Sequence, residues 1–425
     1  MIKQLSDEVE LREYMPKKGF LADYMSYSDE IESPGSFHFW VAATVVSAVL
    51  QRRVYTLRRN KKIYPNLYTV LVAPSGICRK TEAILSGMDL VEGFSWLNVI
   101  ADKTSPEALL EALMKGTAQV ASGSGMINLY SDSIGLIRAP ELSVFLNKSS
   151  YNQDIVSLLT DLFDCRAEFK YITRNKKPIL LNNIAVQFLG GTTPEWLATN
   201  LPEAAFGGGF MSRFIFVVRH RRDRANGIEK NASEKYDKMA QQRIELKTKL
   251  LKIHLDSLGE IIMSDEAIEW YNPWYYNLCE HPPVVDSNLT GFIERKPTTL
   301  IKLAMILAVS EERMAITKED LITGLKLLDW VDERAFDAFR HVDLSHLGRI
   351  KLKIIELLTL AGGRISRREV LRKIGGQLNG MADLETIQQL MEQSGELIVA
   401  ATTNPGKQSI MYYLPKKEEK ENGKQ

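Results

Sequence analysis

The stretch LYTVLVAPSGICRKTEAI, residues 67–84, has the order of a phosphate-binding loop. Its apolar, β-branched start is typical of a buried strand, and its end, TEAI, continues as a helix. Between them lies a loop of small residues that leads to Lys80 and Thr81. In such a loop, backbone N–H groups point at phosphates, the Lys reaches the β- and γ-phosphates, and the hydroxyl binds Mg²⁺.

The loop departs from the usual pattern at one position. That pattern has Gly immediately before the Lys, and here the residue is Arg79. A frame that starts at Ala73 matches a G-P-S-G opening with one extra residue. A plain strand, turn and helix with a surface Lys-Thr pair would look the same, so the loop alone leaves both interpretations open. The residues predicted to hold ATP are Pro74, Ser75, Gly76, Ile77, Cys78, Arg79, Lys80 and Thr81.

The composition is that of a globular protein. The chain has 425 residues, 45% apolar and 25% charged, which is enough for two or three domains. Lys and Arg number 54 against 53 acids, so a nucleic-acid surface must be a local patch. The three cysteines lie far apart, which argues against a disulfide framework or a zinc site and fits a reducing, cytoplasmic setting. No apolar run approaches the roughly 20 residues of a membrane span, so we expect no membrane partner.

Periodicity and composition predict an α/β protein in five parts. Residues 64–220 alternate β-branched runs with helical stretches, which indicates a parallel sheet with helices on its faces. Strands are expected at residues 67–72, near 126–130, near 134–138, at 184–190 and at 213–218. The parts are an N-terminal helical segment at 1–63, irregular up to about residue 36, then the core at 64–220, a helical lid at 221–345, a winged helix at 346–415 and a disordered tail at 416–425.

Two hairpins are predicted outside this sheet. EFKYITRNKKPILLNN, residues 168–183, alternates about a basic tip. In residues 346–415, three helices are followed by a second hairpin, which is the winged-helix order. Ser366 and Glu369 form a capping box at the start of the second of these helices. This part has nine Lys and Arg against six acids, a small excess that fits either DNA binding or protein docking.

Polar residues that could complete a nucleotide site follow the loop in the sequence. An ATPase needs an acid at the end of a neighbouring strand, and Glu141 is the candidate, although Pro140 stands where an Asp would precede it. The metal acid is either Glu141 alone or another carboxylate such as Asp132; a helix-start acid would look the same. Thr192 and Thr193 end a predicted strand, where a hydroxyl can order water, or simply form a turn.

Arg213 lies between a glycine-rich segment and the last predicted strand. A cation exposed there suits the role of an arginine finger, which reaches the nucleotide of an adjacent subunit. An Arg that only flanks a strand edge would look the same. The order of loop, acid, polar strand end and Arg carries more information than any one member.

This order resembles that of AAA+ ATPases. Six segments carry the resemblance: ESPGSFHFW, YPNLYTVLVAPSG with RKT, SPEALLEAL, PELSVFL, LGGTTPEWL and GGGFMSRFIFV. Together they resemble the ATPase domains of phages and mobile elements that are described as primase-associated helicases, and the SRF segment and winged helix are similar to minichromosome-maintenance helicases. The likeness spans roughly residues 30–415. In that family an Arg or Lys before the loop Lys is tolerated.

The resemblance implies roles by position. Lys80 and Thr81 would bind phosphate and Mg²⁺, Glu141 would be the catalytic acid and a metal ligand, and Thr192 or Thr193 would be the sensor. Arg213 would act in trans, and Arg295 matches a second sensor that contacts the γ-phosphate. A solvent-exposed Arg at a helix start would look the same as Arg295.

The resemblance also implies DNA as a partner. In ring helicases of this type the inserted hairpin points into the channel, where Lys follows phosphate and an aromatic residue stacks. The candidates are Tyr171, Arg174, Lys176 and Lys177, although a solvated turn has the same composition. We therefore expect a ring-forming, hexameric, ATP-dependent DNA helicase or translocase for the replication of a phage or mobile element, with its primase in another protein. The alternatives are a non-unwinding DNA-dependent ATPase, such as a loader or transposition regulator, and an inactive nucleotide-bound scaffold.

Overall fold

A computed structural model describes most of the chain, which divides into two compact units, Met1–Ala338 and Phe339–Gln425. The described residues are 11–101, 104–114, 118–122, 125–129, 132–146, 151–172, 178–200, 209–227, 230–283, 285, 289–340, 350–351, 353–355, 357–358, 361–378, 380–404 and 407–414.

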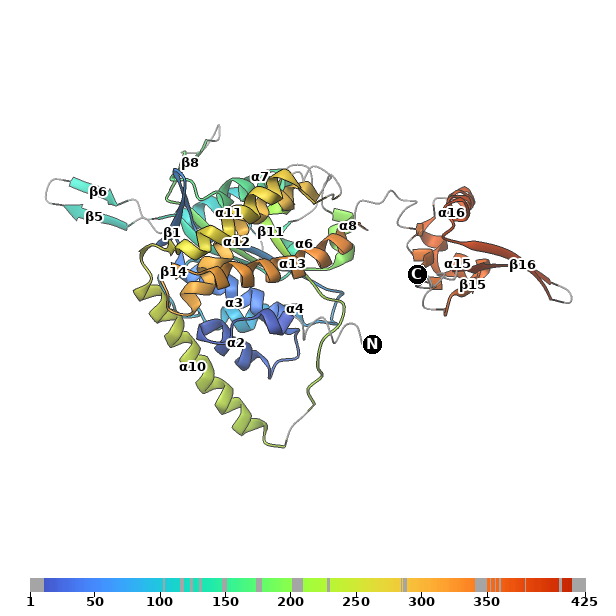
Figure 1. The fold of residues 1–425 in the computed structure, drawn as a ribbon, viewed down its shortest axis with the longest axis horizontal. Coiled ribbons are helices and arrows are strands. Elements are labelled where there is room, and N and C mark those ends of the chain that lie inside the picture. Colours follow the sequence, from blue (N-terminus) through green and yellow to red (C-terminus); the bar gives the residue numbers. More distant parts are fainter. Residues whose placement is uncertain are drawn as a thin grey trace, which may run out of the picture. The chain divides into compact units, whose positions relative to one another are not determined.

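A five-stranded parallel sheet lies at the centre of the first unit (Figure 1). Its strand order is β11-β3-β10-β7-β4. Neighbouring registers align Val72, Thr192 and Val218 at the carboxyl edge, and Tyr68, Phe188 and Phe214 toward the amino edge. The sheet confirms the predicted α/β class. Its strands are β3 (Tyr68–Val72), β4 (Val99–Ala101), β7 (Ile134–Ala139), β10 (Ala185–Thr192) and β11 (Phe214–Val218).

Helices cover both faces of this sheet. The chain leaves β3 through α4 (Lys80–Met88) toward β4, and returns from β7 through α6 (Leu142–Phe145) and α7 (Tyr151–Phe163) to β10. Crossovers between parallel strands are right-handed. The connection from β3 to β4 and the connection from β7 to β10 cross the sheet in opposite directions, so α4 and α7 lie on opposite faces. Helix α3 (Gly35–Leu50) packs against α4, β3 and β10, and all of its residues are buried.

One predicted core strand belongs elsewhere. The run near 126–130 forms β6 (Gly125–Leu129), which pairs with β5 (Ala118–Ser122) in a two-stranded hairpin outside the five-stranded sheet. The fifth position in the sheet is taken by β4, which is three residues long. Helix α5 (Pro106–Met114) begins at the predicted proline.

Residues 19–28 are more regular in structure than their sequence indicated. Residues expected to be irregular form α2 (Gly19–Ser28), which buries Phe20, Leu21 and Tyr24 and packs on α3. The predicted lid contains α10 (Ala232–Asp256), α11 (Asp265–Glu280), α12 (Thr290–Ser310) and α13 (Lys318–Arg340), with short strands β12 (Gly259–Glu260), β13 (Ile262–Met263) and β14 (Ala315–Ile316). These helices share one apolar core with α2, α3 and the sheet.

Two further hairpins extend from the amino side of the sheet. The predicted hairpin is present as β8 (Glu168–Tyr171) and β9 (Ile179–Asn182), which pair antiparallel. A second one, β1 (Val54–Arg58) with β2 (Lys61–Ile63), joins α3 to β3. The segment at residues 1–63 was expected to be helical, but α3 ends at Leu50 and β1 begins at Val54, so its last part forms strands.

The second unit has its own apolar core. Residues 350–351, 353–355 and 357–358 are helical, and they are followed by β15 (Arg364–Ser366), α15 (Arg367–Ile374), α16 (Met381–Gln393), β16 (Ile398–Asn404) and β17 (Lys407–Tyr413). The strands form one antiparallel sheet in the order β15-β17-β16. Ser366 and Glu369 form the predicted capping box. In neither unit do the described helices include one with the length and apolarity needed to cross a membrane.

Candidate nucleotide site

The loop after β3 leads directly into the amino end of α4. Lys80, the first residue of α4, is buried, and its ammonium donates hydrogen bonds to the carbonyl oxygens of Ala73 at 2.7 Å and Pro74 at 3.4 Å. Burial lowers the pKa of Lys80, while Glu141, Cys78 and Glu195 oppose this shift. Thr81 follows in the first turn and is exposed. The strand, loop and helix therefore have the arrangement that the sequence predicted.

Arg79 adopts the backbone conformation that normally requires glycine. Its φ is 47° and its ψ is 48°, in the left-handed region. Its guanidinium forms ion pairs with Glu32 and, at 3.9 Å, with Glu82. The usual glycine position thus keeps its geometry although the side chain is Arg. Gly76, whose φ is +73°, has open space where a Cβ would lie.

The apolar part of the loop is fixed against the end of β11. The Cys78 thiol is fully buried and lies 3.8 Å from the carbonyl oxygen of Arg219, to which it donates. Burial raises the pKa of Cys78 to about 11, so this thiol is neutral at physiological pH. Pro74 is half-buried, whereas Ser75, Gly76 and Ile77 are exposed. The exposed residues leave the outer side of the loop accessible.

A buried histidine links α4 to the preceding helices. His38 Nε2 lies 2.7 Å from Ser33 Oγ, and its Nδ1 lies 3.2 Å from the hydroxyl of Tyr24. The Tyr24 hydroxyl donates in turn to Ser86 on α4. Burial, aided by the charge of Arg224, lowers the pKa of His38 to about 3. The histidine of the ESPGSFHFW segment is therefore a neutral structural residue.

Two carboxylates act on Lys80 from the carboxyl edge of the sheet. Glu141 directly follows Pro140 after β7 and is exposed. An acid that served only as a helix cap would accept a hydrogen bond from the first turn of α6, but the Glu141 side chain forms no such bond. Glu195, in the first turn of α8 (Pro194–Asn200), was not predicted from the sequence. Both oppose the lowering of the Lys80 pKa. One sequence signal could have identified Glu195 as a site residue. It is an acid that lies two residues after the polar end of a predicted strand.

Close approach of two strand ends positions Glu141. A Cβ added to Gly191 in β10 would lie 2.6 Å from the carbonyl oxygen of Pro140, and one added to Gly190 would lie 3.0 Å from that of Ala139. Only glycine allows the end of β10 to lie this close to the backbone that leads into Glu141. The two glycines of FLGGTT are therefore part of the site.

Asp132, the alternative metal acid, is excluded by its position. It precedes β7 at the amino edge of the sheet and accepts a hydrogen bond of 2.9 Å from Asn183 Nδ2. Lys80 and Glu141 lie at the opposite, carboxyl edge.

The structure separates the two candidate threonines. Thr193 Oγ1 accepts a hydrogen bond from the backbone N–H of Trp196 at 3.2 Å, so its hydroxyl caps α8. Thr192 is 2% exposed, its carbonyl accepts from Ala73 N at 3.2 Å, and its Oγ1 is buried without a hydrogen-bond partner among the described residues. The Thr192 hydroxyl is buried beside the loop and has unused hydrogen-bonding capacity. It therefore suits the sensor role better than the Thr193 hydroxyl, which caps a helix.

Arg213 and Arg295 lie together at the other edge of the sheet. Arg213 immediately precedes β11, whose Phe214 aligns with Tyr68 at the start of β3. Arg295 on α12 donates from Nε to Ser212 Oγ at 3.1 Å. Burial and the charge of Arg213 lower the pKa of Arg295, and Asp164 opposes this shift.

The Arg213 side chain is not the exposed cation that the sequence suggested. It is 9% exposed and donates to the carbonyl oxygen of Gly209 at 2.7 Å and to Asp164 at 3.4 Å. Nearby, Lys302 is buried and donates to Asn66 Oδ1 at 2.6 Å, and burial lowers its pKa to about 8. This edge therefore carries three cations around one carboxylate.

The predicted DNA-binding residues are only partly described. Tyr171, the last residue of β8, is half-buried, and its hydroxyl donates to Glu107 at 3.3 Å. Arg174, Lys176 and Lys177 lie outside the described residues. The hairpin that carries them begins and ends at the amino side of the sheet, because Asn182 precedes β10 by three residues.

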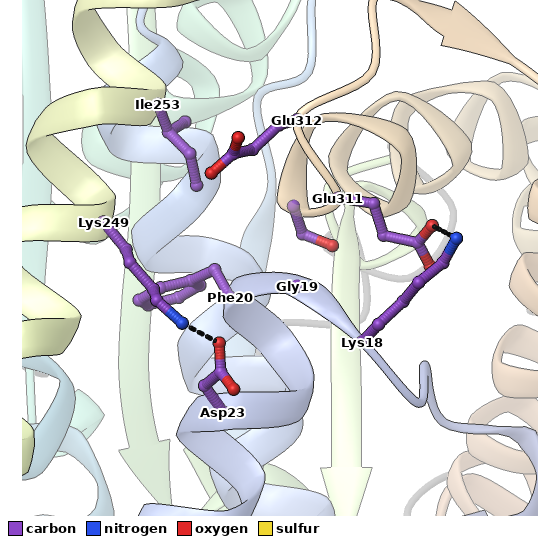
Figure 2. A pocket seen from close by; sticks show the side chains of 9 residues that line it. Lys18, Gly19, Phe20, Asp23, Lys249, Ile253, Glu311 and Glu312 are labelled. Atoms are coloured by element: carbon purple, nitrogen blue, oxygen red, sulfur yellow. Dashed lines mark hydrogen bonds and ion pairs between the residues drawn. The ribbon is translucent and has the colours of Figure 1, made fainter.

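A separate pocket of about 120 Å³ lies between α2, α10 and the end of α12 (Figure 2). Lys249 forms an ion pair with Asp23, and Lys18 lies 3.1 Å from Glu311 across it. The remaining charged residue of the lining, Glu312, forms an ion pair with Lys252 of α10, so every charge of the pocket has a partner, and none of the predicted site residues lines it.

The chemistry of the loop fits ATP and Mg²⁺. Thr81 and Glu141 are hydroxyl and carboxylate ligands of the kind that Mg²⁺ prefers, and this ion also takes phosphate and water, so it needs few protein ligands. Among the described residues there is no cluster of three or more His, Cys, Asp or Glu that would form an all-protein metal cage. No known family model matches this chain, and no curated protein matches its sequence.

Proposed function

We propose that this chain is a ring-forming ATPase of the AAA+ type that uses ATP hydrolysis to move along or unwind DNA during replication of a phage or another mobile element. The observation that carries the proposal is the arrangement around Lys80 at the carboxyl edge of the sheet. A loop and helix N-terminus, the buried hydroxyl of Thr192 and the carboxylates of Glu141 and Glu195 meet there.

The position of this cluster in the sheet supports a nucleotide ligand. In open α/β sheets, ligands bind beyond the carboxyl ends of strands, where the chain connections diverge. The chain leaves β3 toward β4 and later crosses back over β3 to reach β11, so the connections diverge at β3. The loop and the amino end of α4 lie at that point and offer backbone N–H groups to phosphate.

The residues then have distinct tasks in hydrolysis. Lys80 would exchange the carbonyls of Ala73 and Pro74 for β- and γ-phosphate oxygens and offset their charge. Glu141 would orient the attacking water, and Thr192 would hold it or the γ-phosphate through its hydroxyl. Thr81 and Glu141 would hold Mg²⁺, which when bound supplies positive charge that offsets the charge of the phosphates.

Arg213 and Arg295 would serve a neighbouring subunit, for which the Arg213 side chain, 9% exposed here, would have to release Gly209 and Asp164. The five residues of β3 separate the two edges of the sheet by about 16 Å at roughly 3.3 Å per residue. That distance exceeds the reach of an Arg side chain from its own backbone. We therefore assign both arginines to the nucleotide of the adjacent subunit, and hydrolysis depends on a heterologous ring, proposed to be a hexamer.

DNA is the proposed polymer along which the ring moves when it hydrolyses ATP. We assign Tyr171 of β8, and Arg174, Lys176 and Lys177 of the sequence that follows it, to contacts with DNA. The helices and antiparallel strands of the second unit support a winged helix, a module that fits either DNA or a partner such as a separate primase. The three candidate functions, helicase, non-unwinding ATPase and inactive scaffold, differ in the activities that they imply. One set of assays therefore separates them.

The test is ATP turnover with and without single-stranded DNA, beside unwinding of a forked duplex. We expect turnover that DNA stimulates and that Lys80→Ala abolishes. Turnover without strand separation would favour the loader or transposition regulator. No turnover at any DNA concentration, with nucleotide still bound, would overturn the proposal in favour of the scaffold.

A further inference from the structure

The β1–β2 hairpin concentrates positive charge that the proposed mechanism does not use. Residues 52–64, RRVYTLRRNKKIY, contain six Lys and Arg and no acid, in a chain whose net charge is only +1. Arg59, Lys61 and Lys62 at the tip are exposed, and Arg58 is half-buried. The turn is tight, because two residues, Arg59 and Asn60, join the strands, and the φ of Arg59 is 55°.

Carboxylates do not neutralise this charge within the part of the chain that the structure describes. None of Arg58, Arg59, Lys61 and Lys62 forms an ion pair with a described residue, whereas Lys235, Lys249 and Lys252 of α10 each do. The sheet register places an acid, Glu260 in β12, opposite Tyr55 at the base of the hairpin. The three exposed cations at the tip, Arg59, Lys61 and Lys62, therefore remain available to a polyanion.

Aromatic side chains lie beside these cations. Arg58 stacks over the ring of Tyr275 on α11 at 4.6 Å, and Lys62 lies 3.8 Å from the centre of the Tyr55 ring. Tyr276, next to Tyr275, is 57% exposed. A basic surface with accessible aromatic rings is the combination that binds single strands, because the cations follow phosphate and the rings stack on bases.

The base of this hairpin is joined to the base of the β8–β9 hairpin. Arg52 donates to the carbonyl oxygens of Cys165 at 2.6 Å and Arg166 at 3.2 Å, just before β8, and to that of Ile184 at 2.8 Å, just after β9. Its guanidinium also stacks on Tyr64 at 4.3 Å. Figure 1 shows β1 and β8 near one another at the same end of the unit.

We infer that the tip of the β1–β2 hairpin, with Arg59, Lys61 and Lys62, is a second contact for the phosphate backbone of single-stranded DNA. The base of its hairpin is joined through Arg52 to the base of the hairpin that we propose to bind DNA. The inference rests on the proposed function in taking DNA as the polyanion, but it does not require ATP hydrolysis.

The test is the salt dependence of binding to a labelled oligothymidylate, measured by fluorescence anisotropy on the full chain. Removing one contact with a phosphate should make the slope of log K against log salt less steep by about 0.7 on a single strand. We expect the pair Lys61→Gln and Lys62→Gln to weaken binding and flatten the slope by about 1.4. The matched control replaces the exposed Lys230 and Lys238 in the same way and should leave the slope unchanged.

Arg59→Asn provides a second variant that keeps the turn, since Asn tolerates a positive φ, and it should flatten the slope by about 0.7. Circular dichroism melting verifies that each variant is folded. If the wild type binds DNA and both hairpin variants bind like the control, the inference is wrong and the proposed ATPase stands. If the wild type binds no oligothymidylate even at low salt, the inference fails together with the DNA part of the proposed function.

Discussion

Arg79 carries a conformational cost at the centre of the candidate site. A left-handed backbone costs an ordinary residue roughly 1–2 kcal/mol, which glycine avoids. We expect Arg79→Gly to have a free energy of unfolding roughly 1 kcal/mol higher than that of Arg79→Ala, measured by urea denaturation. Both variants lack the ion pairs with Glu32 and Glu82, so the difference between them reflects the backbone. Equal stabilities would contradict the left-handed assignment.

His38 makes stability sensitive to acid. Its folded pKa is about 3 against 6.5 when exposed, so below about pH 6.5 the unfolded chain binds one more proton than the folded chain. The stability of the wild type should therefore fall as pH decreases through this window, by up to roughly 1.4 kcal/mol per pH unit more than that of His38→Gln. Urea denaturation between pH 7 and 5 measures both slopes. Parallel slopes would show that His38 takes up its proton over the same pH range in the folded and unfolded chains, which would contradict the lowered pKa.

Single site residues could be predicted where a local sequence pattern identifies them. Lys80 and Thr81 follow a strand and a small-residue loop, and the structure places them there. Glu195 and Asp164 were missed because their importance comes from Lys80 and Arg213, which are distant in the sequence. Arg213 was expected to be exposed, but its counterion Asp164 lies 49 residues away and cannot be identified from flanking residues.

At the scale of elements, the approach of β7 to β10 is the sharpest constraint on the site. Gly191→Ala would place a Cβ 2.6 Å from the Pro140 carbonyl oxygen, so the two strand ends must separate. We expect a loss of about 1–3 kcal/mol in stability and a fall in kcat, because Glu141 moves with that backbone. Gly227→Ala, where a Cβ has open space, is the matched control. Unchanged turnover in Gly191→Ala would mean that Glu141 does not depend on this contact.

Elements with a distinct local pattern were predictable, and elements without one were not. β3, β10 and β11 are fully buried runs, and α5 and α15 have proline or capping signals at their starts. β4 has only three residues, too few for a period, and β6 has the composition of a core strand but pairs with β5 instead. Helix α2 was missed because the polar residues before and after it gave the whole segment the composition of a loop.

At the scale of the whole molecule, the two halves of the proposed active site lie on opposite edges of one sheet. Lys80 is at the carboxyl edge of β3, and Arg213 and Arg295 are at the amino edge. In the proposed mechanism one subunit therefore cannot complete its own site. Specific ATPase activity should rise with protein concentration as subunits associate, which a dilution series measures, and a constant specific activity would indicate a self-sufficient monomer.

Mixing two inactive variants tests this shared site most directly. Lys80→Ala removes the phosphate ligand and keeps Arg213, whereas Arg213→Ala keeps Lys80, so a complete site forms where the second variant's loop faces the first variant's arginine. We predict that each variant alone is inactive and that an equimolar mixture recovers about a quarter of wild-type turnover, the statistical share of complete interfaces in a heterologous ring. No recovery at any ratio, with both variants folded and assembled, would contradict the shared site.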